Sequence, residues 1–219
     1  MDGSSDDKGG DNIVIKDKIM SLKAINFLPI VLTYLVSING ENNLYSFSAT
    51  NIHNEEISLE LFRDQVVLIV NVASECGYTD SHYKDLQRMY KNLGQDGYFT
   101  ILGFPCNQFG GQEPNEEKVI DKFLKEKYNI QFPMFSKVDV IGENAHPLWK
   151  YLIEESGKSP NWNFFKYLVD HTGKVVDVFP TRTSVEEAYD KVAKYVKRAK
   201  KHAKQATHKI VKKELRDEF

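Results

Sequence analysis

The sequence predicts an α/β fold in which helices flank a mixed central sheet. Two runs of apolar and β-branched residues, 66–72 and 98–104, are typical of strands buried on both faces. A helical pattern lies between them, and this strand–helix–strand order indicates a parallel pair. Later in the chain, two short strands flank the turn 170–173 and add an antiparallel hairpin. The sheet is therefore expected to contain both kinds of pairing.

The other elements follow from apolar spacing and from capping residues. Residues such as Tyr83, Leu86 and Leu93 recur at helical intervals before Gly94, which predicts a helix that ends there. Ser184 stands before two glutamates, as at the start of a helix. In chain order we expect a hairpin of 44–50 and 56–59, a helix over 80–93, a helix over 116–128 capped by Asn115, a strand over 134–140, a helix over 146–154, strands over 166–169 and 174–179, and a last helix that runs into a basic tail.

The composition is that of a globular chain with one core. Its 219 residues include 13 Phe, 11 Tyr and 2 Trp, which is enough aromatic surface to exclude a chain disordered throughout. The presence of only 2 cysteines excludes a disulfide scaffold and a four-cysteine zinc site, but allows a reactive thiol. None of the 6 histidines has metal-ligand spacing, so we expect no metal and no other cofactor.

The carboxyl-terminal part of the chain is strongly basic although the net charge is only -2. Between Lys191 and Phe219 there are 11 lysines and arginines and 3 acidic residues. A solvated helix end or tail is the plain interpretation, and a contact with a membrane surface or a partner is the alternative. No segment resembles a nucleic-acid recognition module, so we expect no nucleic-acid partner.

The first 40 residues are expected to lie outside the domain. Residues 1–19 are polar and predict disorder. Ala24–Gly40 carries no charge, with lysines before it and Glu41 after it, which is typical of a segment entering the secretory pathway. We expect a signal peptide or signal-anchor over 20–40, with membrane association through 24–40 if it is kept. A buried element of the domain is the alternative. The domain then covers 41–198 and the basic tail 199–219.

Two loops at the carboxyl ends of the predicted parallel strands hold the polar residues that could carry chemistry. Cys76 falls between the first strand and its helix, where a helix N-terminus can stabilise a thiolate. The loop 105–112 follows the second strand and contains Cys106. Ligand sites in open α/β sheets form beyond the carboxyl ends of the strands, so we expect the two loops to lie together.

Three segments carry a resemblance to a known family. They read NVASECGYT over 71–79, FPCNQFGGQEPN over 104–115 and WNFFKYLVD over 162–170. In this order and spacing they resemble the glutathione peroxidase family, over about Leu44 to Val196. The resemblance implies a thioredoxin-like fold, in agreement with the element order above.

The resemblance also implies roles for individual residues. Cys76 matches the peroxidatic position, and Gln108, Trp162 and Asn163 match the other three members of a catalytic tetrad. A thiolate that attacks a peroxide becomes a sulfenic acid, and neutral amide and indole N–H groups can stabilise the developing charge. The plainer alternatives are an inert buried thiol, two loop-stabilising amides and a tryptophan that only packs.

The second thiol, Cys106, is harder to assign. Many family members that use thioredoxin carry a resolving cysteine in the helix after the second motif, but the stretch 117–124 has none. Cys106 could resolve the sulfenic acid only if the loops move, because a disulfide needs Cα atoms within about 7 Å. It is either a resolving or auxiliary thiol or a structural one. If it is structural, an external thiol must reduce Cys76.

The resemblance extends to one branch of the family. The short stretch 153–161 looks like that of monomeric members, and the whole is similar to the branch of the endoplasmic reticulum. The final Arg-Asp-Glu-Phe resembles a KDEL-type retrieval signal, with Phe in place of Leu. We therefore expect a lumenal or lumen-facing monomer acting against oxidative stress, with a secreted protein as the alternative.

The expected activity is reduction of hydrogen peroxide or of organic and lipid hydroperoxides. The reductant is expected to be glutathione or a protein dithiol of the protein disulfide isomerase type. The alternative is a non-catalytic thioredoxin-fold protein of the secretory pathway that binds partners or senses redox state.

Overall fold

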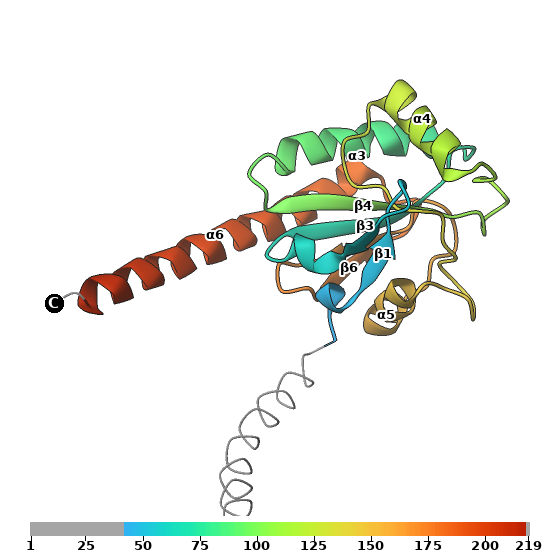
Figure 1. Cartoon of the computed structure of the whole chain (residues 1–219). Coiled ribbons are helices and arrows are strands. Elements are labelled where there is room, and N and C mark those ends of the chain that lie inside the picture. The colour runs from blue at the N-terminus through green and yellow to red at the C-terminus, as the bar shows by residue number, and fades with distance from the viewer. Residues whose placement is uncertain (1–41, 218–219) are drawn as a thin grey trace, which may run out of the picture. The chain divides into compact units, whose positions relative to one another are not determined.

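A four-stranded mixed sheet forms the centre of the computed structural model, which describes residues 42–217 (Figure 1). The strand order is β4-β3-β5-β6. β3 (Val66–Val72) and β4 (Phe99–Pro105) are parallel. β5 (Lys166–Val169) is antiparallel to β3 and to β6 (Val175–Phe179). The expected mixed sheet is therefore confirmed.

Several expectations concern residues that lie outside the described part of the chain. These are the disordered segment 1–19, the signal or anchor segment 20–40 and the end of the Arg-Asp-Glu-Phe sequence. Within residues 42–217, no helix combines the length and the apolar character needed to cross a membrane.

The alternation of side chains along β3 divides the core into two layers. All seven residues of β3 and all seven of β4 are buried. Val66, Leu68 and Val70 belong to one hydrophobic layer, while Val67 and Ile69 belong to the other. Both faces of such a strand pack against the core, so its sequence is a continuous apolar run rather than an alternation of apolar and polar residues.

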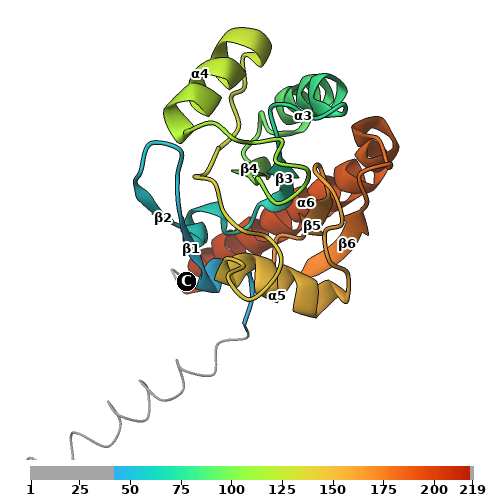
Figure 2. The ribbon, with the colours of Figure 1, turned by 90° about the vertical axis from the view of Figure 1, so that its right-hand side faces the viewer.

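Helices cover both faces of the sheet (Figure 2). On one face lie α3 (Thr79–Leu93) and the first part of α6 (Val185–Asp217), with α4 (Glu117–Tyr128) beside α3. On the other face lies α5 (Pro147–Ser156), whose Leu148 and Trp149 are fully buried. This arrangement leaves the carboxyl ends of β3 and β4 open to the loops that follow them.

The first hairpin is confirmed as a separate two-stranded sheet, but its first strand covers only 48–50 of the predicted 44–50, because 44–46 form a 3₁₀ helix. β1 (Ser48–Thr50) pairs antiparallel with β2 (Glu56–Ser58). Short 3₁₀ helices, η2 (Leu44–Ser46) and η3 (Leu59–Phe62), stand before and after it.

Two local predictions are wrong. The stretch 134–140 is not a strand, because only Met134 and Phe135 form bridges, one to Gly103 of β4 and one to Asn51. Met134 approaches Gly103 so closely that a Cβ there would stand 2.5 Å from the methionine sulfur, so this bridge needs a glycine. Asn115 does not cap α4, since the helix begins one residue later than expected and Glu116 is its N-cap, without a side-chain hydrogen bond.

The last helix is a core element in its first half and a solvated extension in its second. The Ser184 hydroxyl accepts a hydrogen bond from the Glu187 amide, and Glu187 Oε2 accepts one from the Ser184 amide, which is a capping box. The buried residues of α6 end at Ala199. Beyond it the helix runs past the sheet (Figure 1), and residues 204–216 are all exposed. The part of the basic tail over 204–216 is thus a solvated helix end.

Removing residues 205–219 should leave the body of the fold intact, because the described part of this segment buries nothing. We expect the melting temperature to change by less than about 2 °C in thermal unfolding followed by circular dichroism. Val192→Ala, at a fully buried position of the same helix, serves as the contrast and should lower the free energy of unfolding by about 2 kcal/mol. A truncation that destabilises as much as Val192→Ala would contradict this division of α6.

Candidate functional site

Cys76 lies in the loop between β3 and α3 and is 9% exposed. Thr79 shapes this loop. Its hydroxyl accepts a hydrogen bond from the Cys76 amide (3.0 Å) and donates one to the Ala73 carbonyl (2.8 Å). The Thr79 amide in turn donates to the Cys76 carbonyl (3.0 Å). The thiol is therefore held at the start of a 15-residue helix, whose N-cap residue, Tyr78, makes no side-chain cap.

The turn that carries Trp162 and Asn163 is attached to β3 by one buried side chain. Asn71 Nδ2 donates to the Trp162 carbonyl (3.1 Å), and Asn71 Oδ1 accepts from the Phe165 amide (3.0 Å). The Phe164 amide also donates to the Asn71 carbonyl (2.7 Å). Because Asn71 stands five residues before Cys76, this contact brings the turn that carries Trp162 and Asn163 to the thiol-bearing loop.

The same turn points its two candidate residues in different directions. Phe164 has φ of 61°, a left-handed conformation that is unusual for a bulky residue. Just before it, Trp162 is 37% exposed while Asn163 is fully buried. Trp162 and Tyr78 line a hollow of about 500 Å³, together with Asn161, Pro180, Thr181 and Arg182. This hollow is the surface opening next to the Cys76 loop.

The loop after β4 is folded back on itself and reaches the Cys76 loop. Gly110 and Gly111 have φ of 69° and 64°, which glycine adopts without strain. A Cβ on Gly110 would also stand 3.4 Å from the Trp162 ring. The Glu75 amide donates to the Gln112 carbonyl (3.0 Å), next to Cys76. The three motif segments therefore meet at the carboxyl end of β3, as expected for the two loops.

Of the two glutamines in the loop after β4, Gln112 is the one that contacts Asn163. Asn163 Nδ2 donates to Gln112 Oε1 (2.9 Å) and to the Phe109 carbonyl (3.3 Å). Gln108 instead binds the backbone of the next segment. Its Nε2 donates to the Ile141 carbonyl (2.9 Å), and its Oε1 accepts from the Val140 amide (2.7 Å). The motif FPCNQFGGQEPN contains both glutamines, and the resemblance matches Gln108 alone to the tetrad.

Glu113, the residue after Gln112, is a buried carboxyl that the sequence did not single out. Its amide donates to Asn107 Oδ1 (2.9 Å), which closes the loop, and its carbonyl accepts from Lys137 Nζ (2.9 Å). The residue is fully buried, and burial raises the pKa of its carboxyl to about 7. Glu113 therefore anchors the loop that presents Gln112.

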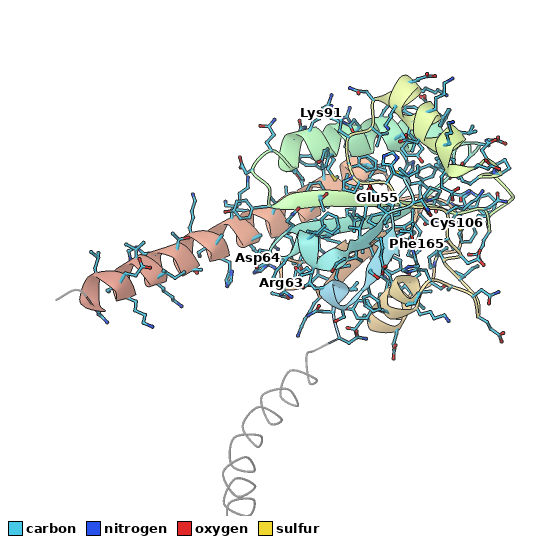
Figure 3. The ribbon with its side chains drawn as sticks, viewed as in Figure 1. Glu55, Arg63, Asp64, Lys91, Cys106 and Phe165 are labelled. Atoms are coloured by element: carbon cyan, nitrogen blue, oxygen red, sulfur yellow. The ribbon has the colours of Figure 1, made fainter. Side chains whose placement is uncertain are left out.

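Cys106 lies on the other side of the sheet from Cys76. Cys76 packs in the layer of α3 and α6, whereas Cys106 packs in the layer of α5, near Phe165 (Figure 3). Both thiols are free, and Cys106 Sγ donates a weak hydrogen bond to Gln108 Oε1 (3.7 Å). Burial raises the pKa of Cys106 to about 11, which disfavours its thiolate. The geometry is that of a thiol facing away from the candidate nucleophile.

No three His, Cys, Asp or Glu side chains between residues 42 and 217 are grouped as metal ligands.

Comparison with known proteins identifies the family. The family described as Glutathione peroxidase matches residues 44–153. Glutathione peroxidase 7 of Homo sapiens is 49% identical over 158 residues, which are 72% of this chain and 84% of that protein. Probable glutathione peroxidase 8-B of Xenopus laevis is 38% identical over 155 residues, 71% of this chain and 74% of that protein.

Solved structures agree with these matches. The crystal structure of T. cruzi GPX1 is similar with a TM-score of 0.58 and 30% identity, and the match covers 71% of this chain and 97% of that chain. A thioredoxin-family thiol:disulfide interchange protein of Chlorobium tepidum TLS shares only 15% identity, with a TM-score of 0.52 over 68% of this chain and 92% of that chain. The second likeness concerns the fold alone, and it confirms the thioredoxin-like fold. With three motif segments gathered at one sheet end and relatives of this identity, the chain belongs to the glutathione peroxidase family.

Proposed function

We propose that this protein is a thiol peroxidase in which Cys76 attacks hydrogen peroxide or an organic hydroperoxide. The observation that carries the proposal is the meeting of three segments around the Cys76 loop. Asn71 holds the Trp162 turn, the Glu75 amide holds the Gln112 loop, and Asn163 joins that loop to the turn. Family membership supports peroxide as substrate and a thiol as reductant.

The proposed chemistry is a two-electron transfer from sulfur to peroxide. The Cys76 thiolate attacks the nearer peroxide oxygen, the O–O bond breaks, and the far oxygen leaves as hydroxide or alkoxide and takes up a proton. Cys76 is then a sulfenic acid. A first external thiol condenses with it to a mixed disulfide and releases water, and a second thiol displaces Cys76 and restores its thiolate.

The hydrogen bonds between Asn163 and Gln112 indicate different roles for the two amides. Asn163 Nδ2 donates both of its hydrogens, one to Gln112 Oε1 and one to the Phe109 carbonyl. Gln112 thus has its oxygen fixed, and its Nε2 group remains as the donor toward charge that develops at the site. In this proposal Asn163 orients Gln112, and Trp162 provides its indole N–H as a second donor at the hollow that it lines. Gln108, the position matched from sequence, orders residues 140 and 141.

We propose an external reductant, either glutathione or a protein dithiol of the disulfide isomerase type. The support is the placement of Cys106, which packs in the opposite core layer from Cys76 and forms no disulfide with it. The hollow lined by Tyr78 and Trp162 leaves room for an approaching thiol. We also propose that the protein acts as a monomer.

Replacing Cys76 by serine should abolish peroxide consumption, because a hydroxyl is not deprotonated at neutral pH and cannot be oxidised to a sulfenic acid. The measurement is peroxide loss with glutathione, and separately with a disulfide isomerase, as reductant. Cys106→Ser is the matched control and should retain turnover with at least one of these external thiols and show the same melting temperature. Full activity of Cys76→Ser would disprove the proposal, and loss of all turnover in Cys106→Ser would show that Cys106 resolves the sulfenic acid.

Gln112→Ala should slow the oxidation of Cys76 by about a hundredfold, the size expected when one preorganised donor is removed. Gln108→Ala should slow this step far less and act mainly on stability, since it removes hydrogen bonds to residues 140 and 141. Stopped-flow measurement of Cys76 oxidation separates the two effects from thermal unfolding. The reverse pattern, with the slow step in Gln108→Ala, would return the catalytic amide to Gln108.

We propose the lumen of the endoplasmic reticulum as the place of action, with secretion as the alternative. The support is the uncharged segment Ala24–Gly40 between lysines and Glu41. The chain itself offers a topology probe in the exposed part of α6. Gln205→Asn completes an Asn-x-Thr acceptor with Thr207 at an exposed position.

In cells with a secretory pathway, Gln205→Asn should give a product whose mass falls on treatment with a glycosidase that removes N-linked sugar. The control carries Thr207→Ala in addition and should show no such shift. An unmodified Gln205→Asn protein that remains in the cytosolic fraction would contradict the lumenal placement.

A further inference from the structure

A buried lysine lies beneath the segments that form the candidate site, although the proposed chemistry does not use it. Lys166 is the first residue of β5 and has 0% of its surface exposed. Its Nζ donates to the Phe164 carbonyl (2.8 Å) and, at longer range, to the Pro180 carbonyl (3.5 Å). Its third contact is His82 Nε2 at 3.4 Å. An ammonium group has three N–H bonds, so each faces one acceptor.

The histidine can accept because its other nitrogen is occupied. His82 Nδ1 is 3.1 Å from the Tyr78 carbonyl, which can only accept, so Nδ1 must carry a hydrogen. Burial, with a smaller contribution from the neighbouring lysine, lowers the pKa of His82 to about 4. The ring is thus neutral at physiological pH, and its Nε2 presents a lone pair to Lys166.

The three acceptors belong to the three segments that line the hollow beside Cys76. Through His82, Lys166 reaches the first turn of α3, and the His82 ring in turn hydrogen-bonds to the carbonyl of Tyr78, two residues after the thiol. Phe164 is the left-handed residue that follows Trp162 and Asn163. Pro180 precedes Thr181, whose hydroxyl donates to the Asn163 carbonyl (2.7 Å). One side chain therefore joins all three segments.

Ring contacts strengthen the same junction. The His82 ring lies 4.8 Å from the Phe164 ring and 5.6 Å from the Tyr78 ring, measured between centroids. The left-handed backbone at Phe164 costs free energy for a bulky residue and persists only where surrounding contacts determine it. The hydrogen bond from Nζ to the Phe164 carbonyl is such a contact.

Burying the charged ammonium group of Lys166 lowers the stability of the folded protein. Within residues 42–217 Lys166 forms no ion pair, and the carboxylate of Glu187 acts on it only at a distance. An apolar side chain of similar length would avoid the cost of burying an ammonium group, and this gain offsets the loss of the hydrogen bonds to the three acceptors. A lysine kept here is therefore better explained by the geometry it imposes.

We propose that Lys166 is a positioning residue that ties the Phe164 turn to α3 and to the Pro180 turn, and so holds Trp162 and Asn163 against the Cys76 loop. Its importance for peroxide reduction rests on the function proposed above. The junction itself does not, since it is defined by contacts that exist whether or not Cys76 reacts.

The junction has a titration of its own. Burial lowers the pKa of Lys166 to about 7, opposed by Glu187 on α6, while His82 on α3 stays neutral. On losing a proton, Nζ keeps two N–H bonds for three acceptors, so the contacts around Phe164 must change near pH 7. The folded protein also binds fewer protons here than the unfolded chain between about pH 7 and 10.5, so the contribution of this group to stability rises with pH in that window.

Lys166→Met tests the proposal, with Lys122→Met on the exposed surface of α4 as the matched control. We expect Lys166→Met to slow oxidation of Cys76 by peroxide about tenfold or more, because three buried acceptors lose their donor, while the melting temperature changes by less than about 5 °C. Lys122→Met should change neither. An unchanged oxidation rate in Lys166→Met, or a loss explained by unfolding alone, would overturn the proposal.

A second measurement follows Trp162 directly and needs no peroxide. Trp149→Phe leaves Trp162 as the single tryptophan, and Cys76→Ser removes the reactive thiol. The indole nitrogen of Trp149 is buried and has no hydrogen-bond partner among the described residues, so Phe loses no bond there. In this background, Trp162 emission should show a step near pH 7, and Lys166→Met should remove it.

The two measurements separate this proposal from the proposed function. If the natural sequence fails to consume peroxide but the step near pH 7 is present and depends on Lys166, the peroxidase proposal fails and the positioning role stands. Absence of the step while Lys166 is present, or its persistence in Lys166→Met, would refute the positioning role. The first of these outcomes can be read even if Lys166→Met does not fold.

Discussion

The arrangement of the site depends on the side chain of Asn71, a polar residue buried in the most apolar strand of the sheet. Both ends of its amide are used, one on the Trp162 carbonyl and the other on the Phe165 amide. An unpaired amide at this depth would cost free energy, so the strand tolerates Asn71 only with the turn before β5 in place. The strand that carries Cys76 and the turn that carries Trp162 are thereby built as one unit.

Around that contact, buried polar side chains hydrogen-bond to the backbone of the segments that form the site. Asn71 fixes the turn, Lys166 joins it to His82 of α3, and Asn107 accepts from the Glu113 amide in the loop that presents Gln112. The reacting groups themselves are few. A rigid setting of this kind suits chemistry in which neutral donors must already point at the place where charge appears.

The sequence predicted most of the fold because β3 and β4 are continuous apolar runs and α3 has apolar residues at helical intervals, which are patterns that local physics decides. The prediction failed where tertiary contacts decide the structure. Within 134–140 only two residues form β-bridges, Met134 to Gly103 and Phe135 to Asn51. The resemblance grouped Cys76 with Gln108, Trp162 and Asn163, but the motif alone does not show which way each amide points. Only the fold shows that the Gln112 amide contacts Asn163 while the Gln108 amide binds the backbone of residues 140 and 141.

The separation of the two thiols by the sheet has a kinetic meaning. A peroxidase working as proposed has no second sulfur waiting beside its oxidised cysteine, so the lifetime of the sulfenic acid is set by collisions with thiols in solution. A second peroxide molecule competes in those same encounters and would carry the sulfur to the irreversible sulfinic acid. How many turnovers one molecule completes would then be determined by its surroundings, through the ratio of thiol to peroxide that it meets.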